Sequence, residues 1–136
     1  MAADSFLCPG ILRSMKTLLL VDDSPTVRHV ERNILGPLGF QIIEATNGDE
    51  ALCALREHPE IEIMLLDWNM PVMNGIECLR RLREEFAGRP LKVLMCTTEG
   101  EMGRILEAMQ AGADEYIMKP FTAEIVQGKL AGAGAL

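Results

Sequence analysis

Five short aliphatic runs alternate along the chain with longer segments of helical periodicity, and this alternation constrains the fold more than any other feature. The runs cover residues 16–21, 40–45, 61–66, 91–96 and 115–118. They are mostly apolar rather than strictly alternating, which is typical of parallel strands that are buried on both faces. Each run precedes a helical pattern, so we predict an α/β domain built from five β–α units.

The helical segments fall at residues 24–39, 48–57, 74–88, 101–112 and 122–136. Ser24 is a natural N-cap, and Pro25 suits the first turn of the helix that follows. In this first helix an apolar stripe of Val27, Val30, Ile34 and Leu38 is expected to face the sheet. With right-handed crossovers, five such units predict a doubly wound five-stranded parallel sheet of order 2-1-3-4-5. Five helices would cover it, giving a flavodoxin-like three-layer sandwich.

Composition limits the function classes. The chain has 136 residues, 49% of them hydrophobic, which suits one domain with a substantial core. Its net charge of −7 argues against nucleic acid as a partner and favours a cation or a basic protein surface. We expect residues 1–14 to form a tail of unknown role and residues 15–136 to form the domain. No run is long enough to span a membrane, and four widely spaced cysteines suggest buried thiols in a reduced, cytoplasmic protein.

Polar side chains follow four of the five predicted strands, at the edge where a parallel sheet binds its ligands. They are Asp22 and Asp23 after the first run, Asp67 after the third, Thr97 and Thr98 after the fourth, and Lys119 after the fifth. Each taken alone could be a turn residue or a helix cap. In the predicted strand order, however, these four strand ends are neighbours, so the side chains should converge on one patch.

Three converging carboxylates require a counter-charge, because two such charges about 4 Å apart cost roughly 4 kcal/mol at an effective dielectric near 20. A hard divalent cation such as Mg²⁺ satisfies this requirement through carboxylate and carbonyl oxygens. No histidine or cysteine cluster points to zinc. Mg²⁺, one lysine and one threonine hydroxyl also form a phosphate-binding set. Asp67, at the end of the central strand, is then a candidate nucleophile that would form an aspartyl phosphate.

The motifs LLLVDDSPTVR, MLLDWNMPVMNGIE, LMCTTEG and QAGADEYIMKPFT occur in this order along the chain. With them the sequence resembles a response regulator receiver domain, and more closely the stand-alone CheY-like chemotaxis regulators, from residue 16 to about residue 130. The resemblance implies that Asp67 is the phosphoacceptor. It also implies that Asp22, Asp23, Asp67 and the backbone carbonyl of Asn69 hold Mg²⁺.

The resemblance further implies that Lys119 pairs with the phosphoryl oxygens and precedes a cis bond to Pro120. Thr97 and Tyr116 would be the switch residues, moving together when Asp67 is phosphorylated. Gly75 would permit a tight turn before the third helix. Trp68, Thr98 and Glu99 would be accessory residues near the phosphoryl site; Thr98 is bulkier than the alanine common at its position, and is expected to narrow access.

The implied function is that of a stand-alone, monomeric response regulator in a two-component phosphorelay. A sensor histidine kinase would donate the phosphoryl group, and the face formed by the fourth helix, fifth strand and fifth helix would carry the output. The output target would be a protein such as the flagellar motor switch or a phosphotransfer protein. Chemotaxis or motility control is the expected pathway, and the alternatives are a phosphate sink or a single-domain relay intermediate elsewhere. No DNA-binding output and no membrane insertion are expected.

Two other function classes fit less well. An aspartate-nucleophile phosphatase of the haloacid dehalogenase type requires an Asp-x-Asp motif after the first strand, whereas Asp22 and Asp23 are adjacent. A pseudo-receiver that only binds partners would not need the full set of Asp22, Asp23, Asp67, Thr97 and Lys119. We therefore expect a protein that is not an enzyme for other substrates and that catalyses only its own phosphorylation and dephosphorylation.

Overall fold

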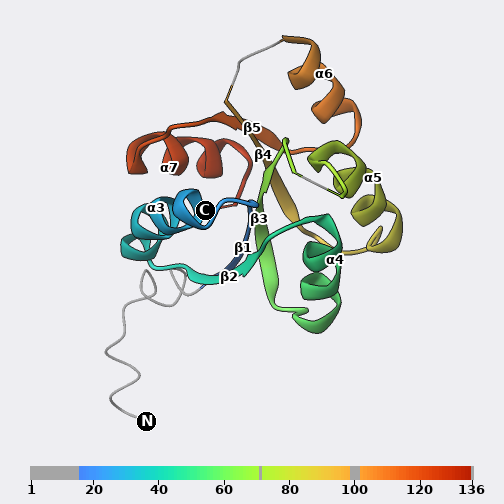
Figure 1. The fold of residues 1–136 in the computed structure, drawn as a ribbon, viewed down its shortest axis with the longest axis horizontal. Helices are drawn as coiled ribbons and strands as arrows, with labels where there is room; N and C mark the ends of the chain where they lie inside the picture. Colours follow the sequence, from blue (N-terminus) through green and yellow to red (C-terminus); the bar gives the residue numbers. More distant parts are fainter. Residues whose placement is uncertain (1–15, 71, 99–101, 136) are drawn as a thin grey trace.

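The computed structural model describes residues 16–70, 72–98 and 102–135, and within them the chain forms one parallel sheet between two layers of helices (Figure 1). The strand order is β2-β1-β3-β4-β5, as predicted. The strands are β1 (Thr17–Val21), β2 (Gln41–Ala45), β3 (Ile61–Asp67), β4 (Lys92–Thr97) and β5 (Glu115–Met118). The central strand β3 is buried at six of its seven positions, which explains its almost continuous apolar sequence.

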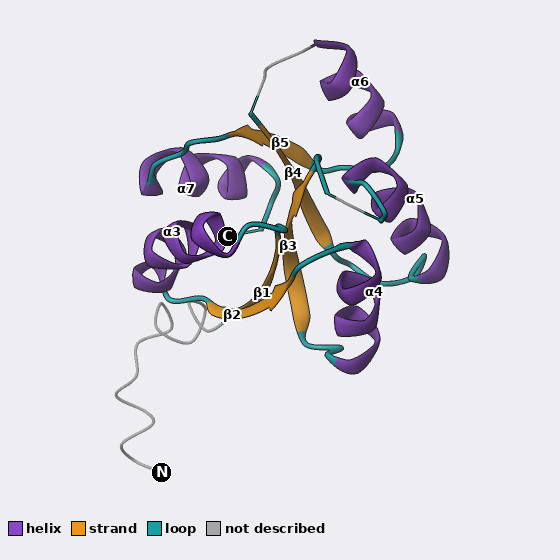
Figure 2. Ribbon diagram, in the orientation of Figure 1, coloured by secondary structure: helices purple, strands orange, loops and turns teal. Residues whose placement is uncertain are grey.

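Helices cover both faces of the sheet (Figure 2). Helices α3 and α7 lie on one face, and α4, α5 and α6 lie on the other. Their bounds are α3 (Pro25–Leu35), α4 (Gly48–Glu57), α5 (Gly75–Glu85), α6 (Met102–Gln110) and α7 (Ala123–Gly132), and a 3₁₀ turn (Gly36–Leu38) follows α3. Each face has its own core of buried residues. The predicted three-layer sandwich is confirmed.

Helix α3 begins as predicted but faces the sheet differently. Ser24 accepts a hydrogen bond from the Val27 N–H at 3.2 Å, so the N-cap is confirmed. The predicted stripe is wrong at Val30, whose side chain is 51% exposed. The buried residues of α3 are Glu31 and Leu35, which share a face because they are four positions apart. Because glutamate is rarely buried, the apolar pattern left out Glu31. It therefore placed the sheet-facing side of α3 one residue too early in the sequence.

Two arginines fix the end of the sheet opposite to the strand termini that carry the acidic residues. Arg83 donates to the carbonyl oxygens of Gly112 and Leu91 and to the Asp114 carboxylate, all at 2.7–2.9 Å. Arg89 donates to the carbonyls of Leu55, His58 and Ile61. These bonds join the segments that lead into β3, β4 and β5, because Ile61 starts β3 while Leu91 and Asp114 directly precede β4 and β5.

Two expectations drawn from composition have mixed outcomes. Cys78 and Cys96 are buried as expected, whereas Cys53 is exposed on α4. In the part of the chain that the structure describes, every helix is too short or too polar to cross a membrane. The tail at residues 1–14 lies outside the described residues.

Candidate functional site

Three aspartates meet at the carboxyl ends of β1 and β3. Asp22 and Asp23 follow the last residue of β1, and Asp67 is the last residue of β3, the neighbouring strand. One carboxylate oxygen from each lies within 4.8 Å of the others. Asp22 and Asp67 are only 2% and 5% exposed, while Asp23 is exposed. The cluster is therefore a half-buried acidic pocket with one side open to solvent.

Lys119 bridges the two buried aspartates. It follows β5, and its Nζ lies 2.8 Å from Asp22 Oδ2 and 3.1 Å from Asp67 Oδ1. Its backbone N–H donates to the Thr97 carbonyl at 2.8 Å, which holds the lysine against the end of β4. The Lys119–Pro120 peptide bond is cis, as the sequence resemblance implied. Four strand ends thus contribute to one site, as their order predicted.

Burial and charge act in opposite directions on Asp67. Burial raises the pKa of its carboxyl group, and the charge of Asp22 raises that pKa further. The Lys119 ammonium and the backbone N–H of Asn69 stabilise the ionised form and lower that pKa. Burial also lowers the pKa of Lys119, but the bond to Asp22 and the charges of both aspartates outweigh it and raise that pKa overall. The lysine therefore stays protonated, and its charge offsets part of the cost of burying the aspartate side chains, while burial leaves the pKa of Asp67 raised overall.

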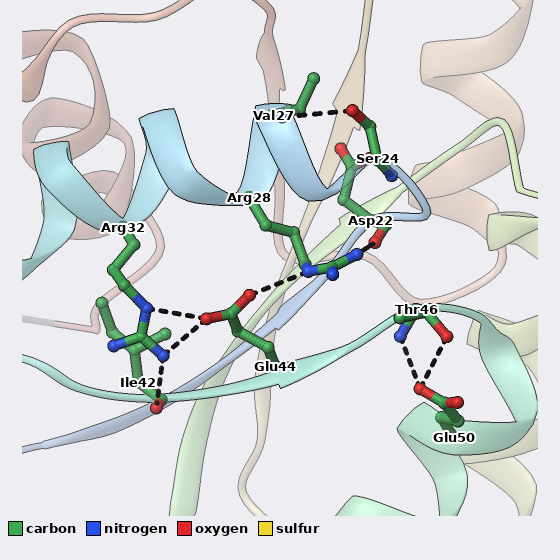
Figure 3. Close-up of polar contacts among 9 residues, drawn as sticks. All are labelled: Asp22, Ser24, Val27, Arg28, Arg32, Ile42, Glu44, Thr46 and Glu50. Atoms are coloured by element: carbon green, nitrogen blue, oxygen red, sulfur yellow. Dashed lines mark hydrogen bonds and ion pairs between the residues drawn. The ribbon is translucent and has the colours of Figure 1, made fainter.

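Arg28 holds in place the acidic loop, which carries Asp22 and Asp23, and this role was not predicted from the sequence. Its guanidinium donates to the backbone carbonyl of Asp22 at 2.6 Å and to Glu44 on β2 at 2.8 Å (Figure 3). Arg32, one turn later, also binds Glu44. The signal in the sequence was an arginine in the first turns of the helix that follows Asp22 and Asp23, with an acidic residue on the adjacent strand.

Gly75 is required for a reason other than the predicted turn. Its N–H donates to the Trp68 carbonyl at 2.9 Å, and Asn74 caps α5 by accepting from the Glu77 N–H. A Cβ at Gly75 would lie 2.9 Å from the Trp68 Cα and closer still to the Asp67 carbonyl oxygen. Gly75 is therefore needed because it has no Cβ, which lets the start of α5 pack directly against the backbone of Asp67, the candidate phosphoacceptor.

Trp68 turns into the core rather than toward solvent. It is 8% exposed and packs in the core on the α4–α5–α6 face. The Arg104 guanidinium of α6 lies 5.4 Å from the ring centroid. Trp68 also borders an open pocket together with Asp23, Asn69 and Arg104. The ring therefore forms one wall of the acidic site.

Of the remaining predicted residues, Thr97 and Tyr116 lie beside Trp68, whereas Thr98 does not. Thr97 is buried at the end of β4, and it lines a small cavity with Trp68 and with Tyr116 of β5. Tyr116 is half-buried, and the Lys129 ammonium lies 3.9 Å from its ring centroid. Thr98 is exposed and lines a different cavity, beside α3. Glu99 lies outside the described residues.

The donor set fits a magnesium ion. Three carboxylates within 4.8 Å of one another supply hard oxygen ligands, and one of them faces solvent, so bound water could complete the shell. The exposed Asn69 lies two residues beyond Asp67 and lines the same open pocket as Asp23. No thiol or imidazole belongs to this cluster, so the chemistry of the site favours Mg²⁺ over zinc.

Comparison with known proteins agrees with this geometry. Residues 18–131 match the family described as the response regulator receiver domain. The chain belongs to the response regulator receiver family. A "Chemotaxis protein CheY homolog" from Campylobacter jejuni is 40% identical to it over 114 residues, covering 83% of this chain and 88% of that protein. This receiver domain is therefore a component of two-component signalling with chemotaxis proteins among its relatives.

Solved structures show the same fold. The CheX-CheY-BeF3-Mg²⁺ complex from Borrelia burgdorferi contains a chain of 32% identity and TM-score 0.78, with 87% of this receiver and 88% of that chain covered. A probable two-component system response regulator/GGDEF domain protein matches with a TM-score of 0.83 and 30% identity. That match covers 91% of this receiver but 53% of the other chain, so the receiver spans about half the length of that protein.

Proposed function

We propose that this receiver accepts a phosphoryl group on Asp67 from a phosphohistidine of a sensor kinase. The observation that carries the proposal is the bridge from one ammonium, Lys119, to two buried carboxylates, Asp22 and Asp67. A structural ion pair would need only one carboxylate. A second carboxylate, with exposed Asp23 beside it, leaves the site with excess negative charge that a metal ion can neutralise, and the bound ion would then attract the oxygens of a phosphoryl group.

In the proposed step, a carboxylate oxygen of Asp67 attacks the phosphorus atom in line with the phosphohistidine nitrogen. The new O–P bond forms as the N–P bond breaks, and the electron pair returns to the imidazole, which takes up a proton. Lys119 then exchanges its contact with the carboxylate for one with a phosphoryl oxygen. The same residues promote the later hydrolysis, in which water attacks phosphorus, the O–P bond to Asp67 breaks, and the products are the free Asp67 carboxylate and inorganic phosphate. We infer no reaction on other substrates.

Asp22, Asp23, Asp67 and the Asn69 carbonyl would hold Mg²⁺, which when bound neutralises charge on the phosphoryl oxygens. The Arg28 bond to the Asp22 carbonyl fixes the acidic loop before the cation arrives. Gly75 lets the start of α5 lie against the backbone of Asp67. Both features reduce the reorganisation that phosphorylation requires.

Thr97 and Tyr116 would couple this site to an output face. The two residues border one small cavity, so a movement of the Thr97 hydroxyl toward a phosphoryl group makes room for the Tyr116 ring. The adjoining surface of α6, β5 and α7 exposes four large apolar side chains, which are Leu106, Met109, Met118 and Ile125. Exposed apolar residues gathered on neighbouring elements mark a protein-binding surface.

The relatives point to the pathway. A homologue named for chemotaxis and a solved complex of CheY with CheX support a regulator whose output partner is a protein. We infer that this regulator acts as a cytoplasmic monomer. A flagellar motor switch component is the proposed target, and a phosphotransfer protein is the alternative. In a phosphate sink or relay, phosphorylation of Asp67 would proceed without partner binding at the α6–β5–α7 face.

Intact-mass measurement tests the phosphorylation proposal. With acetyl phosphate and Mg²⁺, the wild-type chain should gain one phosphoryl group, and Asp67→Asn should gain none. Asp49→Asn is the matched control, because Asp49 is an exposed aspartate of α4. Equal labelling of wild type and Asp67→Asn would sink the assignment. Capture experiments with beryllofluoride-treated protein and a Met118→Asp variant would then separate output signalling from a phosphate sink.

A further inference from the structure

A second cavity lies outside the acidic pocket and is lined by residues of α3 and of the segment that joins β5 to α7. Its volume is about 270 Å³. The walls are mainly apolar, and they include Val27, Val30 and Ile34 of α3 and Pro120 and Phe121 after β5. Val30 is 51% exposed at its edge, so the cavity is open to solvent. Concave, largely apolar sites with one or two polar groups are typical of small-molecule binding.

Glu31 is one of the polar residues that line this cavity, and its burial is unusual. The residue is 4% exposed, and it lines the cavity from α3. Its Oε2 atom is buried without a hydrogen-bond partner among the residues that the structure describes. A buried carboxylate oxygen without a donor is unfavourable, so a group in this cavity that supplied an N–H or O–H would stabilise it.

The charges around Glu31 indicate whether a hydrogen-bond donor to its Oε2 atom should be neutral or cationic. Glu31 interacts electrostatically with Asp22, Asp67 and Lys119. The Lys119 ammonium is already bound by both aspartates, so two carboxylates share one positive charge before Glu31 is counted. Burial, opposed by Lys119 and reinforced by both aspartates, raises the pKa of Glu31 to about 7. A cation in the cavity would remove this cost by stabilising the ionised carboxylate.

We propose that the cavity beside α3 binds a small organic cation, an ammonium group on a compact apolar body. The ammonium would donate to Glu31 Oε2, and the apolar body would pack against Val27, Val30 and Phe121. The site is separate from the magnesium ligands and does not depend on phosphorylation of Asp67. It borders the same lysine, however, because Lys119 and Thr98 also line the cavity.

The test uses 2-phenylethylammonium as the probe and follows backbone amide NMR signals of the full chain at saturating Mg²⁺. The Mg²⁺ competes for the acidic pocket, so an ammonium that merely binds Asp22, Asp23 and Asp67 is displaced. Shifts should centre on Val30, Ile34 and Phe121, with a dissociation constant on the order of 1 mM for a ligand of this size. The neutral isostere 2-phenylethanol should bind about tenfold more weakly.

Two variants separate the charge of Glu31 from the shape of the cavity. Glu31→Gln and Glu31→Leu should each weaken binding of the ammonium about tenfold, with the NMR spectrum confirming that both fold. Glu57→Gln is the matched control, because it removes one exposed glutamate of α4, on the opposite face of the sheet. Equal affinity for the ammonium and the alcohol would overturn the proposal and leave an apolar docking groove. Loss of binding on addition of Mg²⁺, or shifts centred on the acidic pocket, would also overturn it.

Discussion

Gly75 lies so close to Asp67 that a side chain at residue 75 would collide with the backbone of the proposed phosphoacceptor. A Cβ there would meet the Asp67 carbonyl oxygen and approach the Trp68 Cα to 2.9 Å. Real Cβ atoms essentially never lie this close to backbone atoms. The start of α5 and the end of β3 therefore fix each other, and the position of the Asp67 side chain depends on a residue with no side chain.

Gly75→Ala should destabilise the protein and weaken the acidic site together. Overpacking against rigid backbone costs about 1–3 kcal/mol, and the displaced Asp67 should bind Mg²⁺ less tightly. Urea unfolding and Mg²⁺ titration measure the two effects. Gly128→Ala is the control: this glycine lies within α7, a Cβ there meets nothing within 4 Å, and the change should leave Mg²⁺ affinity intact. An unaltered Gly75→Ala protein would contradict the packing argument.

Arg28→Met should weaken Mg²⁺ binding although Arg28 is not a metal ligand. The change removes the 2.6 Å bond to the Asp22 carbonyl that holds the acidic loop. Loss of a group that orients a metal ligand typically costs about tenfold in affinity. Arg32→Met is the matched control, because Arg32 hydrogen-bonds to Glu44 and to the Ile42 carbonyl, both on β2, rather than to the Asp22 carbonyl. Equal Mg²⁺ affinities in the two variants would show that the loop holds its shape without Arg28.

Glu31 should make the stability of the protein depend on pH. Its carboxyl group has a pKa of about 7 in the folded chain against 4.5 for the ordinary group. A raised folded pKa favours the protonated folded state, so stability is greatest below pH 4.5 and falls as pH rises toward 7. The full loss is about 3 kcal/mol for a buried group.

Glu31→Leu removes that dependence. The free energy of unfolding of the variant minus that of wild type should grow between pH 4.5 and pH 7.5 and then remain constant. Chemical unfolding at a series of pH values measures it. Glu57→Gln, at an exposed position, serves as the control. A difference that stays constant across this range would show that Glu31 ionises normally in the folded protein.

Mg²⁺ should change the emission of Trp68. The ring borders the pocket that contains Asp23 and Asn69, and the Arg104 guanidinium lies over it at 5.4 Å. Because Trp68 is the only tryptophan, the signal needs no label. Arg104→Gln should alter the emission without Mg²⁺, because the cation–π contact is lost. A flat Mg²⁺ titration of a chain that still becomes phosphorylated would place the bound cation away from the ring.

Val72→Asn should stabilise the protein. Val72 has a φ of 69°, and a β-branched residue is strained in this left-handed region, whereas asparagine tolerates it. Its side chain is 82% exposed, so little packing is lost. The expected gain is about 1 kcal/mol in urea unfolding. Val30→Asn, another exposed valine but within α3, should give no such gain. A destabilised Val72→Asn protein would indicate that the Val72 side chain makes stabilising contacts.

The strand order and the acidic cluster could be predicted from the sequence because both follow from repeating patterns. Apolar runs mark buried parallel strands, and the residues directly after them must gather at one edge of the sheet. The contacts of individual residues could not be predicted from these patterns. Glu31 was missed because charge argues against burial, and Arg28 was missed because its partner Glu44 lies on another element. The role of Gly75 depends on a contact between backbones that no pattern in the sequence encodes.

Hydrogen bonds from two arginines hold together the amino ends of β3, β4 and β5, which form one end of the sheet. Arg83 and Arg89 each bind backbone carbonyls of separate loops, so the segments entering these strands cannot slide independently. The opposite edge carries the acidic residues and is joined mainly through Lys119. We therefore expect a structural change that begins at Asp67 to move neighbouring loops and helices sideways rather than to shift the strands lengthwise against one another.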